Sequence, residues 1–417
     1  MKKFFALLLA IAGSTMVRAQ VDSMGELLNK GQMGELKKSL MSHVRTMDKN
    51  RWLYLQCFVD NAFGHFERSY MESQALLKNH ASNFSDAELA RIAVLNYYNY
   101  FNSYQYKAAG DHALEVKKKY AKVLTADDTV MLNNAIALCE QLKGVAKATS
   151  TKTADVKLEF ARKEGNLVTI PMSFGTKETT VALHPEDGFS TISLSEAKKL
   201  GLKMIAETGS DKTKKLPKYA VADTITIGGK VTLKNVLFSL VPDPTTTGAK
   251  PEMAALGTNA LRLLGEFIVN RDGTVAILQK ADRAPYKNYF ADCNTQKLLV
   301  ADEDGKEFFM DFGLRLSPTG MNGKFWKNNE DLLKSKGQKC KNLNISGKKD
   351  EDYCRMLDYK VRVGITLIGL PGMEVYKRSP FMASGGNWES NGYLGTDVYE
   401  HFTTLKINYE EAFVEYK

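Results

Sequence analysis

The spacing of hydrophobic residues changes once along the chain, near residue 147. Upstream, apolar side chains recur every three or four residues, as in amphipathic helices, for example over Met24–Thr46 and Ala87–Asn102. A polar linker, Lys147–Asp155, follows, and beyond it short alternating runs such as Leu167–Met172 indicate strands. The pattern predicts a multidomain α + all-β protein, with a helical domain over residues 20–146 and β structure from residue 147 onward.

Two turns of the helical domain have related sequences. Phe63–Ser69 aligns with Ser103–Ala109, and each segment holds a turn, an aromatic residue and a helix start with a small residue three positions on. This weak repeat resembles the helix pairs of tetratricopeptide proteins. We therefore expect TPR-like helical hairpins, which could offer a surface to a protein partner.

A stronger internal similarity lies in the β part. Leu256–Leu278 aligns with Leu394–Tyr416 without a gap, the Leu-Gly-Thr that opens each segment is identical, and Asn259 corresponds to Asp397. A repeat of this kind indicates a duplicated unit. We expect two related β lobes, over residues 147–284 and 285–417.

The segment Thr180–Leu202 resembles the active-site element of retropepsin-like and pepsin-like aspartic peptidases. In that family a strand enters Asp-Thr-Gly-Ala, then a hydrophobic-Ser-x-Ile-Ser stretch, then Ala-x-x-Leu-Gly-Leu. Phe189–Ser193 and Ala197–Leu202 match this frame without a gap, but His184-Pro185-Glu186-Asp187 stands where Asp-Thr-Gly-Ala should be. The resemblance implies a bilobal peptidase-like fold with a ligand cleft between the lobes and a degenerate catalytic motif.

Aspartic peptidases use two carboxylates that share one proton, because two like charges so close cannot both ionise. In the second lobe the string Asp311-Phe312-Gly313 keeps an Asp and a Gly of the motif. We therefore expect Asp311 to lie opposite His184, as the two residues at the catalytic positions. An imidazolium beside a carboxylate is an ion pair, not a shared-proton dyad, so peptide hydrolysis by the ordinary mechanism is disfavoured.

Other interpretations of these residues stay open. Glu186 or Asp187 could replace the missing Asp, or His184 could be a base oriented by Asp311, although no G-x-S-x-G nucleophile motif occurs. His184 could equally be a loop residue without a role, and Asp311 a local turn residue. Glu186 and Gly313 are candidate ligand-binding positions. So are Gly228 and Gly229, as a flap over the cleft or the turn of an ordinary hairpin.

Composition limits the remaining possibilities. Residues 1–19 have the charged start, short apolar core and small-residue end of a secretory signal, which predicts export to the periplasm or outside the cell. Removing Lys2, Lys3 and Arg18 from the formal charge of +9 leaves +6, without a basic cluster typical of nucleic-acid binding. No later stretch is apolar for the length of a membrane span.

The five cysteines predict one crosslink and no metal site. Cys340 and Cys354 flank a polar loop and are expected to form a disulfide, whereas Cys57 and Cys139 could be buried thiols or a pair, and Cys293 has no catalytic context. No Cys/His spacing suits zinc, and no cofactor is expected.

Three functions follow from the sequence. The first is a pseudopeptidase that binds a peptide or a protein partner between its lobes. The alternatives are an active endopeptidase with an altered dyad centred on Asp311, and a structural scaffold of the cell envelope.

Overall fold

The computed structural model describes residues 23–163, 166–205, 218–243, 254–291, 296–315, 318–343, 351–377 and 390–417. The chain divides into two compact units, and the boundary between them falls between Gly144 and Val145 in the sequence. The predicted signal peptide and Cys293 lie outside the described residues. Within the described part, no helix has both the length and the hydrophobicity needed to cross a membrane.

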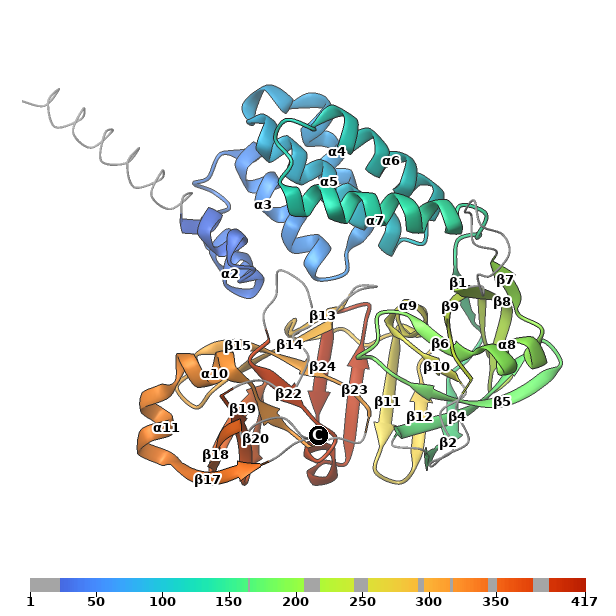
Figure 1. The fold of residues 1–417 in the computed structure, drawn as a ribbon, viewed down its shortest axis with the longest axis vertical. Coiled ribbons are helices and arrows are strands. Elements are labelled where there is room, and N and C mark those ends of the chain that lie inside the picture. The colour runs from blue at the N-terminus through green and yellow to red at the C-terminus, as the bar shows by residue number, and fades with distance from the viewer. Residues whose placement is uncertain are drawn as a thin grey trace, which may run out of the picture. The chain divides into compact units, whose positions relative to one another are not determined.

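The first unit is a run of helices in which each packs against the next (Figure 1). Their bounds are α2 Met33–His43, α3 Lys49–Ala62, α4 Phe66–Asn79, α5 Asp86–Asn102, α6 Tyr106–Lys119 and α7 Ala126–Leu142. Side-chain capping boxes begin α5, at Ser85 and Glu88, and α7, at Thr125 and Asp128. Such boxes satisfy N–H groups that a helix start leaves unpaired, so these starts are set locally.

The turns after α3 and α5 share one geometry. The amide of His65 donates to the carbonyl of Asp60 at 2.8 Å, and the amide of Gln105, forty residues later, donates to that of Tyr100 at 3.0 Å. The residue before each donor has a positive φ, 79° at Gly64 and 61° at Tyr104. The predicted repeat of helical hairpins is therefore present, although a glycine in one hairpin is replaced by a strained tyrosine in the next.

The second unit contains two β lobes. The first lobe begins with β1 Thr149–Lys152, β2 Val156–Glu159, β3 Ala161–Lys163, β4 Asn166–Phe174, β5 Lys177–Leu183, β6 Ser190–Ser193 and α8 Leu194–Leu200. It continues with β7 Lys203–Ile205, β8 Tyr219–Ile227, β9 Val231–Val241, β10 Ala254–Leu256, α9 Thr258–Leu261, β11 Glu266–Asn270 and β12 Thr274–Ile277. Its main sheet has the order β1-β9-β6-β10-β5-β4-β8-β7, and it places β10 between β5 and β6.

The second lobe repeats this scheme with additional elements. Its first part is β13 Tyr289–Ala291, β14 Gln296–Ala301, β15 Glu307–Phe312, β16 Gly320–Met321, α10 Gly323–Asn328, α11 Glu330–Lys336, β17 Gly337–Leu343 and β18 Glu351–Met356. The rest is β19 Tyr359–Val363, β20 Thr366–Leu370, β21 Met373–Tyr376, β22 Gly392–Leu394, β23 Thr404–Asn408 and β24 Phe413–Tyr416. Here β22 lies between β15 and β16, as β10 lies between β5 and β6.

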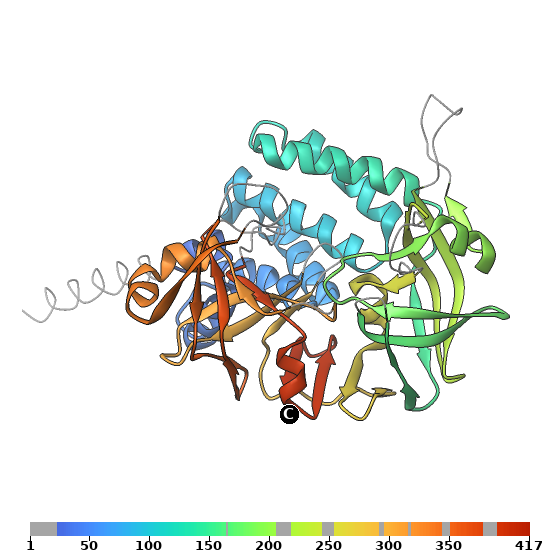
Figure 2. The same ribbon diagram turned by 60° about the horizontal axis from the view of Figure 1, so that its bottom comes forward.

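A sheet built from both lobes joins them, in the order β2-β12-β11-β23-β24. Figures 1 and 2 show β11 and β23 side by side between the lobes. Ile268 of β11 pairs with Lys406 of β23, and these residues are 138 positions apart, the offset of the sequence duplication. Glu266 pairs with Asn408, and Asn270 pairs with Thr404, at equal distances on either side. The register is therefore symmetric about the central pair, as a pseudo-two-fold axis requires.

The predicted fold class is thus confirmed, as a helical domain followed by a duplicated, two-lobed β domain. Side chains that seal the junction between the lobes, such as Phe267 and Ile407, are fully buried in one apolar cluster that runs through both lobes. Burial of such side chains stabilises the paired lobes by about 2 kcal/mol each relative to exposure.

The cysteines give a mixed outcome. Cys57 and Cys139 are buried free thiols, and burial raises the pKa of Cys139 to about 12, so both are unreactive at neutral pH. In the β17–β18 pair, Cys340 lies opposite Tyr353 and Cys354 lies opposite Lys339. This one-residue offset disfavours the Cys340–Cys354 disulfide, which stays a prediction.

Candidate functional site

Strand register shows which positions of the two lobes correspond. Ala182 of β5 pairs with Ala255 of β10 in the first lobe, and Asp311 of β15 pairs with Tyr393 of β22 in the second. Ala255 and Tyr393 are 138 residues apart, which is the offset of the duplication. Asp311 is therefore the counterpart of Ala182, a residue inside a strand.

The same correspondence holds after the loops that follow β5 and β15. In the first lobe, Asn259 Oδ1 accepts hydrogen bonds from the amide and hydroxyl of Ser190, at 2.7 and 2.8 Å. In the second, the carboxylate of Asp397 accepts from the amide and hydroxyl of Thr319, at 2.9 and 2.7 Å. Both loops therefore have the same length, and a constant offset of 129 residues relates them.

This correspondence changes the predicted pairing of site residues. The offset places Gly313, and not Asp311, at the position equivalent to His184. The contacts agree, because His184 lies against Asp187 and Arg315, whereas Asp311 lies against Lys297. The string Asp311-Phe312-Gly313 predicted a loop position for Asp311, but β15 continues through Asp311 to Phe312, so the position equivalent to His184 lies two residues later.

Asp311 is a paired carboxylate within its sheet. It forms an ion pair with Lys297 of the neighbouring strand β14, and its amide donates to the hydroxyl of Ser390 at 2.9 Å. The Lys297 side chain is almost completely buried, so the ion pair with Asp311 offsets part of the cost of burying its charge.

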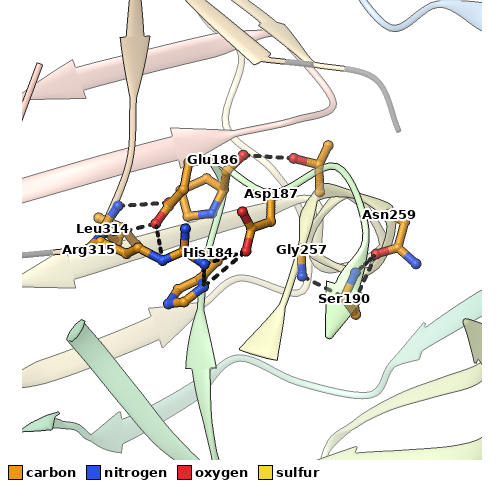
Figure 3. Close-up of polar contacts among 10 residues, drawn as sticks. His184, Glu186, Asp187, Ser190, Gly257, Asn259, Leu314 and Arg315 are labelled. Atoms are coloured by element: carbon orange, nitrogen blue, oxygen red, sulfur yellow. Dashed lines mark hydrogen bonds and ion pairs between the residues drawn. The ribbon is translucent and has the colours of Figure 1, made fainter. Parts of the chain in front are cut away.

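Glu186 crosses from the first lobe to the second, as Figure 3 shows. Its carboxylate accepts hydrogen bonds from the amides of Leu314 and Arg315, at 3.0 and 3.2 Å. A Cβ added at Gly313 would lie 2.7 Å from Glu186 Oε2, so this carboxylate fills the space that a side chain at 313 would need. Burial raises the pKa of Glu186, and the nearby His184, the backbone amides around the carboxylate and the charge of Arg315 offset only part of that rise.

Arg315 closes the contact from the other side. Its Nη2 donates to Asp187 Oδ2 at 2.7 Å and lies 3.0 Å from His184 Nδ1 (Figure 3). Burial raises the pKa of Asp187, but its contacts with His184 and Arg315 outweigh this effect and hold the pKa below its usual value. His184 is completely buried, whereas the Arg315 side chain is 48% exposed, so the cluster reaches solvent through the guanidinium.

The loop that carries these residues is held from behind by β10 and α9. The His184 amide donates to the carbonyl of Leu256 at 2.8 Å, and the Thr258 hydroxyl donates to that of Pro185 at 2.9 Å. A Cβ at Gly257 would lie 2.4 Å from the backbone of Phe189, so only glycine permits this approach. The Leu-Gly-Thr string of the duplication therefore supports the loop.

The hairpin around Gly228 and Gly229 has contacts of its own. Both glycines have positive φ, 55° and 70°, as a type I′ turn requires. A Cβ at Gly228 would lie 2.5 Å from Val156 of β2, and the amide of Thr153 donates to the carbonyl of Lys230 at 3.0 Å. These contacts hold the tip against the start of the β unit and favour the ordinary hairpin over the flap.

Sequence reasoning singled out Glu186 but missed Arg315. The two residues are 129 positions apart and so occupy equivalent places in the two loops, with opposite charges. Residues at equivalent positions of two related lobes lie close together near the two-fold axis. A gapless alignment of the loop after β5 with the loop after β15 would therefore have paired Glu186 with Arg315. Among the described residues, no group of three or more His, Cys, Asp or Glu side chains is placed to hold a metal ion.

Comparison with solved structures shows a structural similarity, whereas the sequence comparisons find none. No family model matches the sequence, and no relative is found among curated proteins. The structure is similar to that of a retropepsin-like aspartic protease from Rickettsia conorii. The two share 15% identity with a TM-score of 0.22, over 32% of this chain and 95% of the protease chain. Similarity at this level does not assign the chain to a family.

Proposed function

We propose that the protein is a catalytically inactive, peptidase-like protein that binds a peptide or a protein partner between its two β lobes. If the resemblance of Thr180–Leu202 to the peptidase motif holds, the first catalytic carboxylate would stand at position 184, and the strand register supports 313 as its counterpart. These positions hold His184 and Gly313. A shared-proton dyad requires a carboxylate at each, so neither half of the usual chemistry is available.

One observation carries this proposal: the carboxylate of Glu186 fills the space beside Gly313 and binds the opposite loop. In the peptidase motif, a Thr at the second position ties the two loops together. Pro185 and Leu314 stand at that position here, and Glu186 supplies the tie instead. The junction therefore keeps its role of joining the lobes while its centre is occupied by a structural carboxylate.

The alternative of an endopeptidase centred on Asp311 has less support. A general base must be able to take a proton from water, but the Asp311 carboxylate is held by the buried ammonium of Lys297. A pure scaffold would need only the ion pairs of Arg315 across the junction, and not the solvent exposure of about half of its side chain. Charged groups presented on a rigid support are typical of binding sites.

The proposal places the protein outside the cytoplasm, in the periplasm or beyond the cell, because its first 19 residues have the pattern of a secretory signal. Its helical hairpins offer a second surface for a protein partner. Exposed apolar side chains at Met41, Met71 and Val130 are suited to such contacts, although single exposed apolar residues are also common on ordinary surfaces.

A peptide-library assay tests the proposal. The full-length mature chain is incubated with a mixed peptide library between about pH 3 and about pH 8, and the products are read by mass spectrometry. We expect no cleavage, and retention of a subset of peptides that is reduced in Arg315→Gln but not in Arg162→Gln. Arg162 is a half-exposed arginine elsewhere in the first lobe that also forms an ion pair, with Glu400.

The opposite result would be cleavage that disappears in Asp311→Asn, which keeps the size of the side chain. That outcome would establish an active endopeptidase. A chain that neither cleaves nor retains any peptide would favour the scaffold.

A further inference from the structure

The hairpin of β19 and β20 in the second lobe is equivalent to the hairpin of β8 and β9 in the first. Thr191 of β6 pairs with Ser239 of β9, and Gly320 of β16 pairs with Glu374 of β21. Thr191 and Gly320 are related by the 129-residue offset of the two loops, so Ser239 and Glu374 are equivalent, and these later strands have an offset of 135 residues. The same offset carries the first residue of β9 onto the first residue of β20.

An added strand covers the edge of β9 that faces away from β8. β1 pairs antiparallel with the first four residues of β9, Val231–Lys234 (Figure 1). Just before them, the amide of Thr153 donates to the carbonyl of Lys230 at 3.0 Å. At Ile365, the equivalent of Lys230, the amide donates to the hydroxyl of Tyr286 at 3.4 Å. Within the described ranges, no strand continues from there along β20, which is the last strand in the order of its sheet.

The backbone groups of Leu367 and Gly369 point away from β19. A two-residue turn precedes β20, and Val363 pairs with Thr366 across it. The pair beside such a turn exchanges hydrogen bonds within the hairpin, and the direction of the backbone groups then alternates along the strand. Leu367 and Gly369 therefore each direct an N–H and a C=O to the outer edge, as the equivalent residues of β9 do toward β1.

The exposed side of β20 is apolar, whereas the exposed side of β9 is polar. Three positions related by the offset show this difference, with Lys230, Thr232 and Lys234 in the first hairpin against Ile365, Leu367 and Gly369 in the second. Ile365 is 70% exposed and Leu367 is 45% exposed. Natural edge strands usually carry charges, proline or a bulge that discourage pairing, but β20 has the sequence TLIGL, without charge or proline. This edge therefore favours the addition of a strand.

We propose that the outer edge of β20 binds an extended segment of a partner protein, which adds as an antiparallel strand with an aliphatic or aromatic side chain against Leu367. β1 is the template for this addition, because it is a four-residue antiparallel strand on the equivalent edge of the first lobe. A strand of this length is too short to hold two folded copies of the chain together, since a stable interface takes about 20 residues from each partner. Main-chain hydrogen bonds provide the affinity, and the contact with Leu367 selects the side chain.

This site is separate from the contacts at Glu186 and Arg315. It lies on an edge strand of the second lobe and uses none of the residues that join the lobes. The inference therefore does not depend on the function proposed above.

Synthetic peptides based on β1 test the proposal. The parent peptide is Lys147–Ala154, KATSTKTA, and the apolar probes replace both Thr149 and Thr151 by Leu, Ile, Val or Phe. Thr151 pairs with Thr232, the equivalent of Leu367, so the new side chains lie on the exposed side of the strand.

Hydrogen exchange of the full-length mature chain, read residue by residue, reports the added strand. We expect the amides of Leu367 and Gly369 to gain about tenfold or more protection with an apolar probe, and less with the parent peptide. The amide of Ile368 points to β19, so its protection should change little.

Two controls separate strand addition from a general apolar contact. N-methylation of the probe at position 151 removes a donor that faces β20 and should abolish binding, whereas N-methylation at position 150, whose amide faces away, should be tolerated. Leu367→Ser should weaken binding of the apolar probe by about tenfold, because it removes the apolar contact. Leu357→Ser is the matched variant, because Leu357 is 53% exposed but lies between β18 and β19, and it should leave binding unchanged.

The proposal is overturned if no apolar probe protects Leu367 and Gly369, or if the two N-methylated probes bind equally well. Protection of these amides in the free chain also excludes it: a rise with protein concentration would show a second copy at this edge, and a constant value would show that the chain itself covers the edge. Protection confined to Leu314 and Arg315 would support peptide binding at the lobe junction and exclude binding at β20, so the two proposals fail separately.

Discussion

Removal of the Glu186 carboxylate should make room for a side chain at position 313. In Glu186→Ala the amides of Leu314 and Arg315 lose a charged acceptor. Loss of a hydrogen bond to a charged group costs about 1.5 kcal/mol or more, and water can replace part of the loss at the exposed Arg315. For the two bonds together, the variant should be destabilised by about 3 kcal/mol.

Gly313→Ala should be costly in the wild type for a different reason. The new Cβ would lie 2.7 Å from Glu186 Oε2 and 2.5 Å from the Tyr393 hydroxyl, which is overpacking worth about 1–3 kcal/mol. Gly313 is not among the glycines with positive φ, so alanine adds no backbone strain. The Glu186→Ala, Gly313→Ala double variant removes the clash with the carboxylate, and it should lose about 1 kcal/mol less than the two single changes predict together.

The cycle is measured by guanidinium unfolding of the full chain, followed by tryptophan fluorescence. Trp52 lies in the helical unit, so a Trp52→Phe background leaves only Trp326 and Trp388, which belong to the β unit. Gly369→Ala is the matched control, because a Cβ there meets nothing within 4 Å. Its effect on the free energy of unfolding should add to that of Glu186→Ala without coupling. If the effects at 186 and 313 also add to within about 0.4 kcal/mol, the carboxylate does not fill that space.

Three further predictions concern single contacts. Burial, reinforced by Asp60, raises the pKa of Glu72 to about 7 in the helical unit. The folded state therefore holds its proton more tightly than the unfolded state, and the free energy of unfolding should fall by about 2–3 kcal/mol as pH rises from about 4.5 to about 7. Glu72→Gln should remove this fall in urea titrations followed by circular dichroism, and an unchanged pH profile would contradict the assignment. Asp311→Ala removes the carboxylate that is paired with the buried Lys297 ammonium and should cost about 3 kcal/mol. Lys297→Met in the same chain should recover a large part of this loss, and equal stability of the single and double variants would speak against the pair. Thr125→Ala removes the capping box of α7 and should lower the free energy of unfolding by about 1 kcal/mol in the same urea experiment. Thr153→Ala, at a threonine outside any helix, is the comparison for loss of a threonine without loss of a helix cap.

The sequence predicted what depends on local spacing and on repetition. The change of hydrophobic period near residue 147 separated the helices from the strands, because amphipathic helices and half-buried strands bury their side chains at different intervals. The gapless repeat of Leu256–Leu278 in Leu394–Tyr416 predicted two lobes, and the hairpin Glu266–Ile277 proved to be the segment through which each lobe pairs with its counterpart.

Only the tertiary structure decided which residues meet. Strand length cannot be read to within two residues from an apolar run, so the string Asp311-Phe312-Gly313 suggested the wrong counterpart for His184. The symmetric pairing of β11 with β23 brings equivalent loops together, and that long-range contact places Arg315 against Glu186, Asp187 and His184. Such a cluster has no signature in either segment alone, because each charge finds its partner only after the lobes have paired.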